Sequence, residues 1–223
     1  MKILFISLGC DKNLADTEMM LGTLVQRGFS ITDDEAQAQA VVVNTCCFIN
    51  DAKQESINTL LEMAELRKSG AVKALIAAGC LAQRYREEIQ KEIPEVDVIV
   101  GTTAIDAIAD ALEEVLAGKP QNYLKDISHM PAVYDHSAEH KRIVTTGGHY
   151  AYLKIAEGCD KHCSYCIIPK VRGHYRSIPM EELILEAERL VSFGAKEIIL
   201  VAQETTLYGM DLYGEKRLPE LLK

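Results

Sequence analysis

Short apolar runs alternate with longer amphipathic segments through the first 118 residues. Four runs have the length of strands that are buried on both faces: KILFISLG (2–9), AVVVNTC (40–46), VKALIAAGC (72–80) and VDVIVG (96–101). The segments between and after them predict helices over residues 13–28, 51–69, 81–92 and 104–118, with a glycine at or just after three of their ends and Asp51 as an N-cap. This alternation predicts an α/β domain with a largely parallel sheet.

The alternation stops in residues 119–149 and then resumes. This interval holds two prolines, a GlyGly pair and four histidines at positions 129, 136, 140 and 149, whose spacing matches no common metal motif, so it predicts an inter-domain linker. Strands are expected over 150–158 and 196–203, a helix over 179–194 and the start of another at 218. These are about two βα units, fewer than a barrel requires. We therefore predict domains at 1–118 and 150–223 joined by the linker 119–149, and we expect the chain to be the front part of a longer protein.

The net charge of −9 is unevenly distributed. Residues 1–118 carry all of it, while residues 119–223 contain equal numbers of acidic and basic side chains. A general nucleic-acid-binding protein would present a basic face, so the acidic half argues against a direct nucleic-acid substrate and for a basic protein partner. Solubility alone is the preferred interpretation of this charge. No apolar run reaches the ~18 residues that cross a bilayer, and the start MKILFISLGC lacks the cleavage site of a signal peptide. These features predict a cytoplasmic protein without membrane contact, in which the seven cysteines are metal ligands or reactive thiols.

Three cysteines, Cys10, Cys46 and Cys80, each follow a predicted strand. The carboxyl ends of parallel strands share one edge of the sheet, where such folds bind ligands, so three thiols would converge there. Gly9 and Gly79 precede two of these cysteines and leave room for a bulky group. The arrangement predicts a metal or cluster site, with a redox-active thiol set as the alternative.

Four other residues near this edge receive separate interpretations. Cys47 is predicted not to be a ligand, because neighbouring side chains that leave a strand point in different directions. Asn13 could contact a substrate from the same edge. Asp16 and Glu18 could do so too, but favourable charge at the start of a helix is the preferred interpretation for both.

The loop EGCDKHCSYC (157–166) places Cys159, Cys163 and Cys166 in a C-x3-C-x2-C pattern. A zinc site would need a fourth ligand, which His162 or His174 could supply, and an electron-transfer cluster would need a fourth thiolate. A third possibility is a cubane cluster with one iron left open for a substrate. Nearby cations could stabilise an anionic cluster or bind a carboxylate, although solvated surface charge is the preferred interpretation for any one of them; they are Lys161, Lys170, Arg172 and Arg176.

The C-x3-C-x2-C motif, with Tyr165 before its last cysteine, resembles the radical S-adenosylmethionine superfamily. The stretches SLGCDKNLADTE (7–18), VVNTCCFI (42–49) and AAGCLAQRY (77–85) resemble the amino-terminal domain of methylthiotransferases. YAYLKIAEGCDKHCSYCIIPKVRGHYRS (150–177) resembles the start of their radical domain. The resemblance therefore implies a parallel-sheet α/β domain followed by the first βα units of a partial TIM-type barrel.

The resemblance also implies two 4Fe-4S clusters and S-adenosylmethionine. One cluster would be held by Cys159, Cys163 and Cys166, with S-adenosylmethionine on its open iron. The other would be held by Cys10, Cys46 and Cys80, and its open iron would carry the sulfur to be transferred. One S-adenosylmethionine would methylate that sulfur, and a second would yield the 5′-deoxyadenosyl radical that activates the target carbon. Reduction would need a flavodoxin-like or ferredoxin-like electron donor. Contacts to the cofactor are expected from Tyr165, Gln203 and Thr206.

Two branches of this family differ in their motifs. The tRNA branch usually reads GCQMN at the first cysteine, whereas this chain reads GCDKN, and AQETTLYGMDLY (202–213) resembles the ribosomal-protein branch. The favoured function is transfer of a methylthio group to the β-carbon of an aspartate in small-subunit ribosomal protein twelve. The alternatives are a tRNA adenosine methylthiotransferase, an iron–sulfur electron carrier and a zinc-stabilised binding module. The chain departs from the family in having Cys47 where glycine is usual and in its shorter length.

Overall fold

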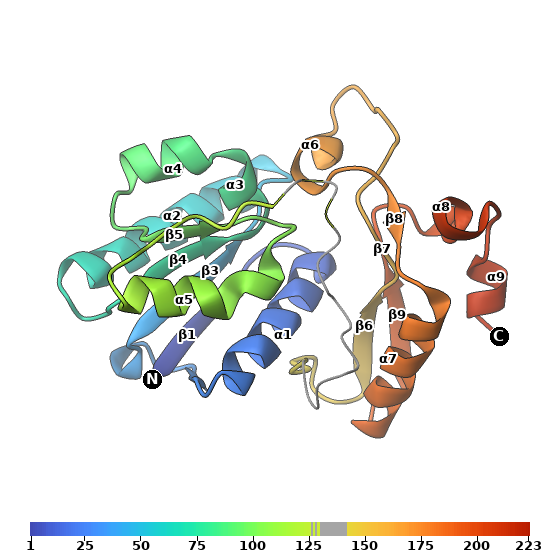
Figure 1. Cartoon of the computed structure of the whole chain (residues 1–223), viewed down its shortest axis with the longest axis horizontal. Coiled ribbons are helices and arrows are strands. Elements are labelled where there is room, and N and C mark those ends of the chain that lie inside the picture. Colours follow the sequence, from blue (N-terminus) through green and yellow to red (C-terminus); the bar gives the residue numbers. More distant parts are fainter. Residues whose placement is uncertain (126, 128, 130–141) are drawn as a thin grey trace.

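A five-stranded parallel sheet forms the centre of the first half of the chain (Figure 1). The structure is a computed structural model that describes residues 1–125, 127, 129 and 142–223. The strands are β1 (Lys2–Ser7), β2 (Ser30–Thr32), β3 (Ala40–Thr45), β4 (Leu75–Ala78) and β5 (Val98–Val100). All four predicted strands are confirmed. The short edge strand β2 is not predicted by the pattern, because it contains a single large apolar residue.

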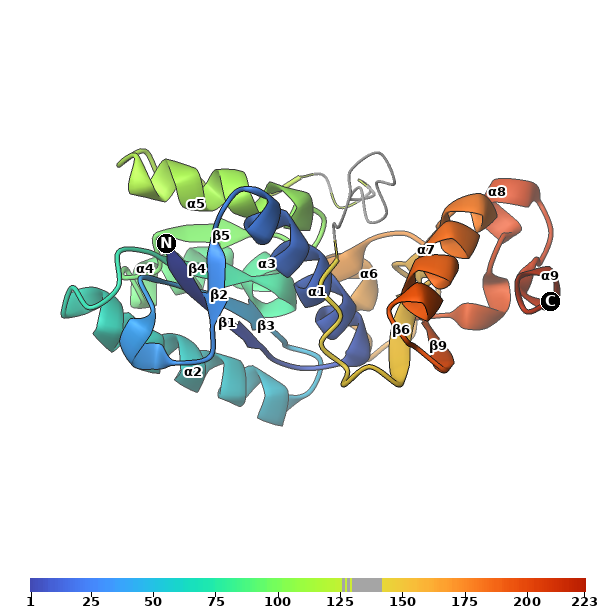
Figure 2. The same ribbon diagram turned by 90° about the horizontal axis from the view of Figure 1, so that it is seen from below.

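Helices cover both faces of this sheet (Figures 1 and 2). Helices α1 (Asp11–Gln26) and α5 (Ile108–Leu116) pack on one face, and α2 (Asn50–Lys68), α3 (Gly79–Arg84) and α4 (Arg86–Glu92) pack on the other. Short 3₁₀ turns occupy Glu35–Gln37 and Ile105–Ala107. Alternate side chains of the fully buried β3 enter the two layers, so both faces bury apolar surface. The predicted α/β class is confirmed.

Two local helix predictions are wrong. The helix expected over 81–92 is divided at Tyr85, whose φ of −117° and ψ of 33° are not helical, into α3 and α4. The N-cap of α2 is the extended residue Ile49, without a side-chain capping bond, and Asp51 lies inside the first turn. The acidic side chain there still complements the positive end of the helix dipole.

The order of the strands is β2-β1-β3-β4-β5. The chain moves outward from β1 in one direction to β2 and in the other to β3, β4 and β5, so the order reverses between β1 and β3. Open parallel sheets bind ligands at the carboxyl ends of the strands beside such a reversal. Cys10 follows β1 and Cys46 follows β3, so both lie at this point.

The second half contains one βαβ unit and a small antiparallel pair. Strands β6 (Tyr150–Lys154) and β9 (Glu197–Val201) are parallel neighbours, and α7 (Met180–Ser192) packs against them. The strand expected over 150–158 is divided at Ile155, because β7 (Ala156–Glu157) turns away to pair with β8 (Arg176–Ser177). Shorter helical elements are α6 (Ile168–Arg172), α8 (Met210–Tyr213), α9 (Leu218–Leu221) and the 3₁₀ turn Thr205–Leu207. This arrangement agrees with the predicted first βα units of a barrel.

Helix α1 belongs to the cores of both halves (Figure 2). Met20 and Leu24 pack in the layer shared with α5, while the adjacent Met19 packs with Ala151 and Leu153 of β6. A helix that is buried on opposite sides holds the two halves of the chain against each other.

The predicted linker is described only at its two ends. Tyr123 extends the sheet by an isolated bridge to Val100, and Ile143 donates its backbone N–H to the carbonyl of Glu18 in α1, at an N–O distance of 3.0 Å. His136 and His140 lie outside the described residues, and the division into three segments stays a prediction. Among the described residues, no helix combines the length and apolar character needed to cross a membrane.

Candidate functional site

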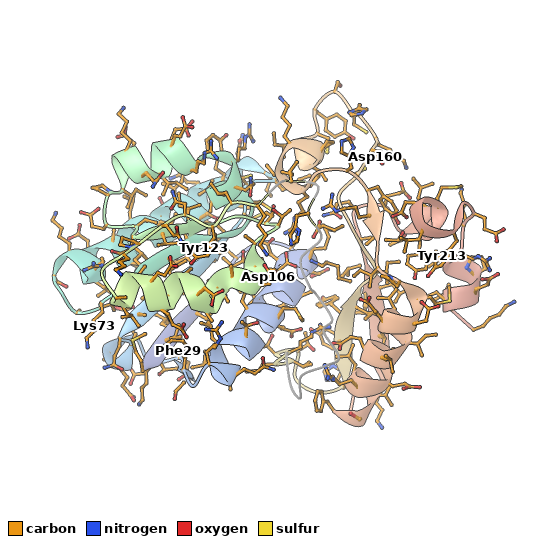
Figure 3. The ribbon with its side chains drawn as sticks, viewed as in Figure 1. Phe29, Lys73, Asp106, Tyr123, Asp160 and Tyr213 are labelled. Atoms are coloured by element: carbon orange, nitrogen blue, oxygen red, sulfur yellow. The ribbon has the colours of Figure 1, made fainter. Side chains whose placement is uncertain are left out.

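Six cysteines from the two halves line one cavity of about 410 Å³. We name Cys10, Cys46 and Cys80 the first cysteine set and Cys159, Cys163 and Cys166 the second cysteine set. The cavity lies where the carboxyl edge of the five-stranded sheet meets the loop between β7 and α6. In Figure 3 the labelled Asp160 marks this loop, beside α6. The structure thus brings together two sets that are separated by 79 to 156 residues.

Cys10 is the N-cap of α1 and is exposed. The residue before it, Gly9, has φ of +94°, and a Cβ added there would lie 2.6 Å from Cys46 Cβ and 2.8 Å from Cys46 Sγ. Real Cβ atoms do not approach so closely, so glycine is what lets the loop after β1 pass against the loop after β3. This close passage brings Cys10 and Cys46 to the same cavity.

Cys46 is buried and held by Ser56 of α2. The backbone N–H of Cys46 donates to Ser56 Oγ at 2.9 Å, and the hydroxyl donates back to the carbonyl of Cys46 at 3.0 Å. The neighbouring Cys47 packs in the apolar layer under α2 and does not line the six-cysteine cavity. Burial raises the pKa of the Cys47 thiol. That Cys47 is not a ligand stays a prediction.

Cys80 stands in the first turn of α3 and is buried beside a cation. Its Sγ lies 3.4 Å from Arg172 Nε and 3.8 Å from Asn13 Oδ1. Burial raises the pKa of the Cys80 thiol to about 12, and the guanidinium of Arg172 opposes that rise. The preceding Gly79 packs its backbone directly on Thr45, where an added Cβ would come within 2.5 Å of the carbonyl oxygen.

The second cysteine set is graded from buried to exposed. Cys159 is buried, Cys166 is partly buried and Cys163 is exposed. The N–H of Cys159 donates to the carbonyl of Gly173 at 3.1 Å, which closes the base of the loop, and the N–H of Cys166 donates to the carbonyl of Cys163 at 3.0 Å. The backbone N–H of Lys161 points at Cys159 Sγ, 3.4 Å away. All three cysteines of this loop line the six-cysteine cavity.

A buried ionic network lies beside the cavity and meets it at Arg172. Arg172 Nη1 lies 2.7 Å from Glu157 Oε2 and 3.0 Å from Asp16 Oδ2, and Nη2 donates to Asn13 Oδ1 at 2.6 Å. Lys154 bonds the same two carboxylates, those of Asp16 and Glu157. Burial would raise the pKa of Glu157, but Arg172 and Lys154 outweigh burial and hold that pKa below its ordinary value.

A second buried ion pair joins α1 to the second half. Arg142 bonds Glu18 through Nε at 2.9 Å and Nη2 at 2.6 Å, and its Nη1 bonds Glu186 of α7 at 3.1 Å. The preferred interpretation of Asp16 and Glu18 as charges at a helix start is therefore wrong, since both are buried and paired across the junction. Surface charge is likewise wrong for Arg172, which is 1% exposed.

Of the remaining residues predicted at the site, some line the cavity and others do not. Lys161, Tyr165 and Gln203 line the cavity, and Tyr165 is 88% exposed. Thr206 does not line it, and its hydroxyl and N–H both donate to Glu204. The exposed His174 contacts Asp160 at 2.8 Å and, like His162, lines a neighbouring cavity. The predicted cofactor contacts stay predictions.

The donor set and its surroundings fit thiolate-held clusters. Three soft sulfur donors from each half face one cavity, with the buried cation Arg172 beside them. Gln203 donates through Nε2 to Glu157 Oε1 at 2.8 Å, and its buried Oε1 has no hydrogen-bond partner among the described residues. That free acceptor suits a cationic ligand group. Among the described residues, no three Cys, His, Asp or Glu side chains are placed to hold a single metal ion.

The sequence does not reveal the roles of Lys154 and Arg142 at the junction, because their partners in α1, Asp16 and Glu18, lie 138 and 124 residues away. Local spacing carries no signal of such pairs.

Comparison with known proteins finds two matching family models. Residues 2–101 match the model described as "Uncharacterized protein family UPF0004", and residues 153–222 match the radical SAM superfamily. The two matches fall on the two structural halves that meet at the cavity.

Curated relatives match over the whole chain. The chain is 61% identical over 223 residues to "Ribosomal protein uS12 methylthiotransferase RimO" of Lachnoclostridium phytofermentans, covering 100% of this chain and 50% of the relative. Proteins of the same name from Acetivibrio thermocellus and Clostridioides difficile are 50% and 48% identical, each covering 100% of this chain and 49% of the relative. The chain spans about half the length of the curated relatives it matches.

Proposed function

Because the chain belongs to the radical S-adenosylmethionine methylthiotransferase family, we propose that its protein transfers a methylthio group to an aspartate β-carbon of ribosomal protein uS12. The observation that carries the proposal is the meeting of both cysteine sets at one cavity. An enzyme that joins sulfur to a carbon radical needs its sulfur source and its radical source within reach of one substrate atom. The relatives' names supply the ribosomal protein as the substrate.

The first cysteine set would hold one 4Fe-4S cluster, and the second cysteine set would hold the other. When bound, the clusters and S-adenosylmethionine would supply the transferable sulfur and the radical chemistry. Three thiolates per cluster leave one iron for a substrate or cofactor, as in catalytic metal sites that keep an open position. Arg172 and Lys161 would offset the negative charge of the thiolates.

Gln203 and Tyr165 would orient S-adenosylmethionine beside the second cysteine set. The free Oε1 of Gln203 would accept a hydrogen bond from the cofactor's ammonium, while Glu157 holds the other end of the same amide. Tyr165 would cover the cavity mouth, since its ring is exposed there. Thr206 would act through Glu204, which it bonds and which does line the cavity.

The partners of the protein follow from the same chemistry. The acidic first half suits a basic ribosomal protein, whose approach it would steer. A flavodoxin-like or ferredoxin-like protein would supply electrons, and the exposed Cys163 marks the side of the second cysteine set nearest to solvent. We place these reactions in the cytoplasm.

Three other functions predict different results in the same experiments. A tRNA adenosine methylthiotransferase would share both clusters and differ only in substrate. An iron–sulfur electron carrier would bind two clusters without S-adenosylmethionine. A zinc-stabilised module would bind zinc with little iron. The names of the relatives favour the ribosomal-protein enzyme over these alternatives.

The testing experiment is iron, sulfide and zinc per chain after anaerobic reconstitution. Unsubstituted protein should bind about eight irons, and alanine substitution of either whole cysteine set should leave about four. Cys47→Ala is the matched control and should retain about eight, because Cys47 lies outside the cavity.

Stoichiometric zinc with little iron would overturn the proposal. With both clusters in place, the full-length protein is then offered uS12 and tRNA separately, with S-adenosylmethionine and a reductant. Methylthiolation of tRNA with uS12 untouched would overturn the choice of substrate.

A further inference from the structure

Arg172 is a buried cation whose hydrogen bonds reach the first cysteine set. Its Nε lies 3.4 Å from Cys80 Sγ, and its side chain is 1% exposed. The two terminal nitrogens are occupied by Asn13, Asp16 and Glu157. With every nitrogen engaged, the guanidinium has one orientation, and that orientation aims Nε at the sulfur.

The same residue is tied by its backbone to the second cysteine set. Arg172 is the last residue of α6 and follows Cys166 by six positions. The next residue, Gly173, accepts a hydrogen bond from the N–H of Cys159. Arg172 therefore cannot move relative to Cys80 without moving the loop of the second cysteine set.

Glu157 closes the connection through side chains. Its Oε2 accepts from Arg172, and its Oε1 accepts from the N–H of Gly158, which directly precedes Cys159. A continuous line of hydrogen bonds thus runs from Cys80 through Arg172 and Glu157 to the loop of the second cysteine set. Each donor and acceptor along it is buried, so water does not compete for these bonds.

We propose that Arg172 is a positioning residue that fixes Cys80 relative to the second cysteine set and tunes the cluster bound to the first. A positive charge and an N–H bond at a ligand sulfur favour the more negative, reduced state of a cluster, and so raise its reduction potential. The proposal rests on the two-cluster assignment made under the proposed function.

Arg142 provides a matched control. It is also a buried arginine that joins α1 to the second half through two carboxylates, Glu18 and Glu186, and its side chain has the same exposed fraction of 1%. It makes no hydrogen bond to a cysteine among its described contacts. A purely structural effect of losing a buried arginine should therefore appear in Arg142 and Arg172 variants alike.

The experiment compares Arg172→Lys with Arg142→Lys, each in protein whose second cysteine set is replaced by alanine. Lysine keeps the charge but loses the fork that reaches Cys80, Asn13 and the carboxylates together. The reduction potential of the remaining cluster is followed by electron paramagnetic resonance during a redox titration. We expect Arg172→Lys to lower the reduced-to-oxidised ratio at a fixed applied potential by about tenfold, from the loss of one charge-assisted bond. Arg142→Lys should leave the ratio unchanged.

A charge-balanced variant, Arg172→Gln with Asp16→Asn, removes the cation without stranding a buried carboxylate and should shift the ratio in the same direction. An unchanged ratio in both Arg172 variants would overturn the inference. So would loss of the cluster from both Arg172 variants together with unfolding, since Arg172 would then act on folding alone. Unsubstituted protein that binds fewer than about eight irons would instead count against the two-cluster assignment itself.

Discussion

Substitution of Gly9, which packs against Cys46, tests how the first cysteine set is assembled. A Cβ at Gly9 would lie 2.6 Å from Cys46 Cβ, whereas carbon atoms in contact are ordinarily about 3.5–4.0 Å apart. Gly9→Ala must therefore push the loops after β1 and β3 apart by roughly 1 Å. We expect this substitution to weaken cluster binding by the first cysteine set and to leave the second set loaded.

Gly28→Ala separates backbone strain from the steric clash. Gly28 has φ of +85°, close to the +94° of Gly9, and no atom lies within 4 Å of its added Cβ. Both substitutions carry about 1–2 kcal/mol of left-handed strain, offset by about 0.4–1 kcal/mol from the reduced entropy of the unfolded chain. Only Gly9→Ala adds overpacking, at about 1–3 kcal/mol. The expected difference in the free energy of unfolding is therefore about 1–3 kcal/mol.

Two assays read this difference. Urea unfolding of the metal-free proteins gives the free energies, and iron analysis after reconstitution gives the loading, which should be about four irons for Gly9→Ala and about eight for Gly28→Ala. Equal stability and equal iron in the two variants would refute the reasoning, because the loops would then have room to separate without consequence.

Two further predictions concern residues that hold the backbone beside each cysteine set, Ser56 for the first and Glu157 for the second. Ser56→Ala removes both bonds to the backbone of Cys46 and should cost about 1–3 kcal/mol in urea unfolding, with iron lost from the first cysteine set. Ser69→Ala, which loses only a bond at an exposed helix end, should change stability by less than about 0.5 kcal/mol, and equal effects would contradict this reading. The lowered pKa of Glu157 means that its carboxylate stabilises the folded protein above the unfolded pKa of about 4.3, and that this contribution is lost as pH falls from there toward the folded value. Metal-free Glu157→Gln should therefore lose less stability than unsubstituted protein between about pH 6 and pH 3 in urea unfolding, and parallel losses would show that Glu157 is not the linked group.

The layout of the first cysteine set could be predicted because it follows from local rules. Buried parallel strands are short apolar runs, and residues that directly follow such strands share one edge of the sheet. Cys10, Cys46 and Cys80 each follow a strand by one to three positions, and all three line the same cavity. The second cysteine set lies within eight residues, so its grouping could also be predicted from the sequence.

The junction could not be predicted, because its partners are far apart in sequence. Glu18 pairs with Arg142 over 124 residues, and Asp16 pairs with Arg172 over 156. A rule that considers one helix at a time assigns both carboxylates to the helix start. The break at Tyr85 could not be predicted for a different reason. The amphipathic pattern runs through this residue without interruption, but its backbone dihedral angles are not helical.

The chemistry of the junction suits positioning better than stability. An apolar interface on both sides of α1 would hold the halves together without the desolvation that buried charges cost, and replacing buried ion pairs with apolar residues is often neutral or stabilising. Apolar contacts, however, have no direction, so α1 could slide against β6 at little cost. Arg142 and Arg172 bind their carboxylates with fixed geometry, and each admits one register of α1 against the second half. A site built from two cysteine sets, one on each half, needs that single register, because a shift between the halves changes the distance between its two groups of thiols.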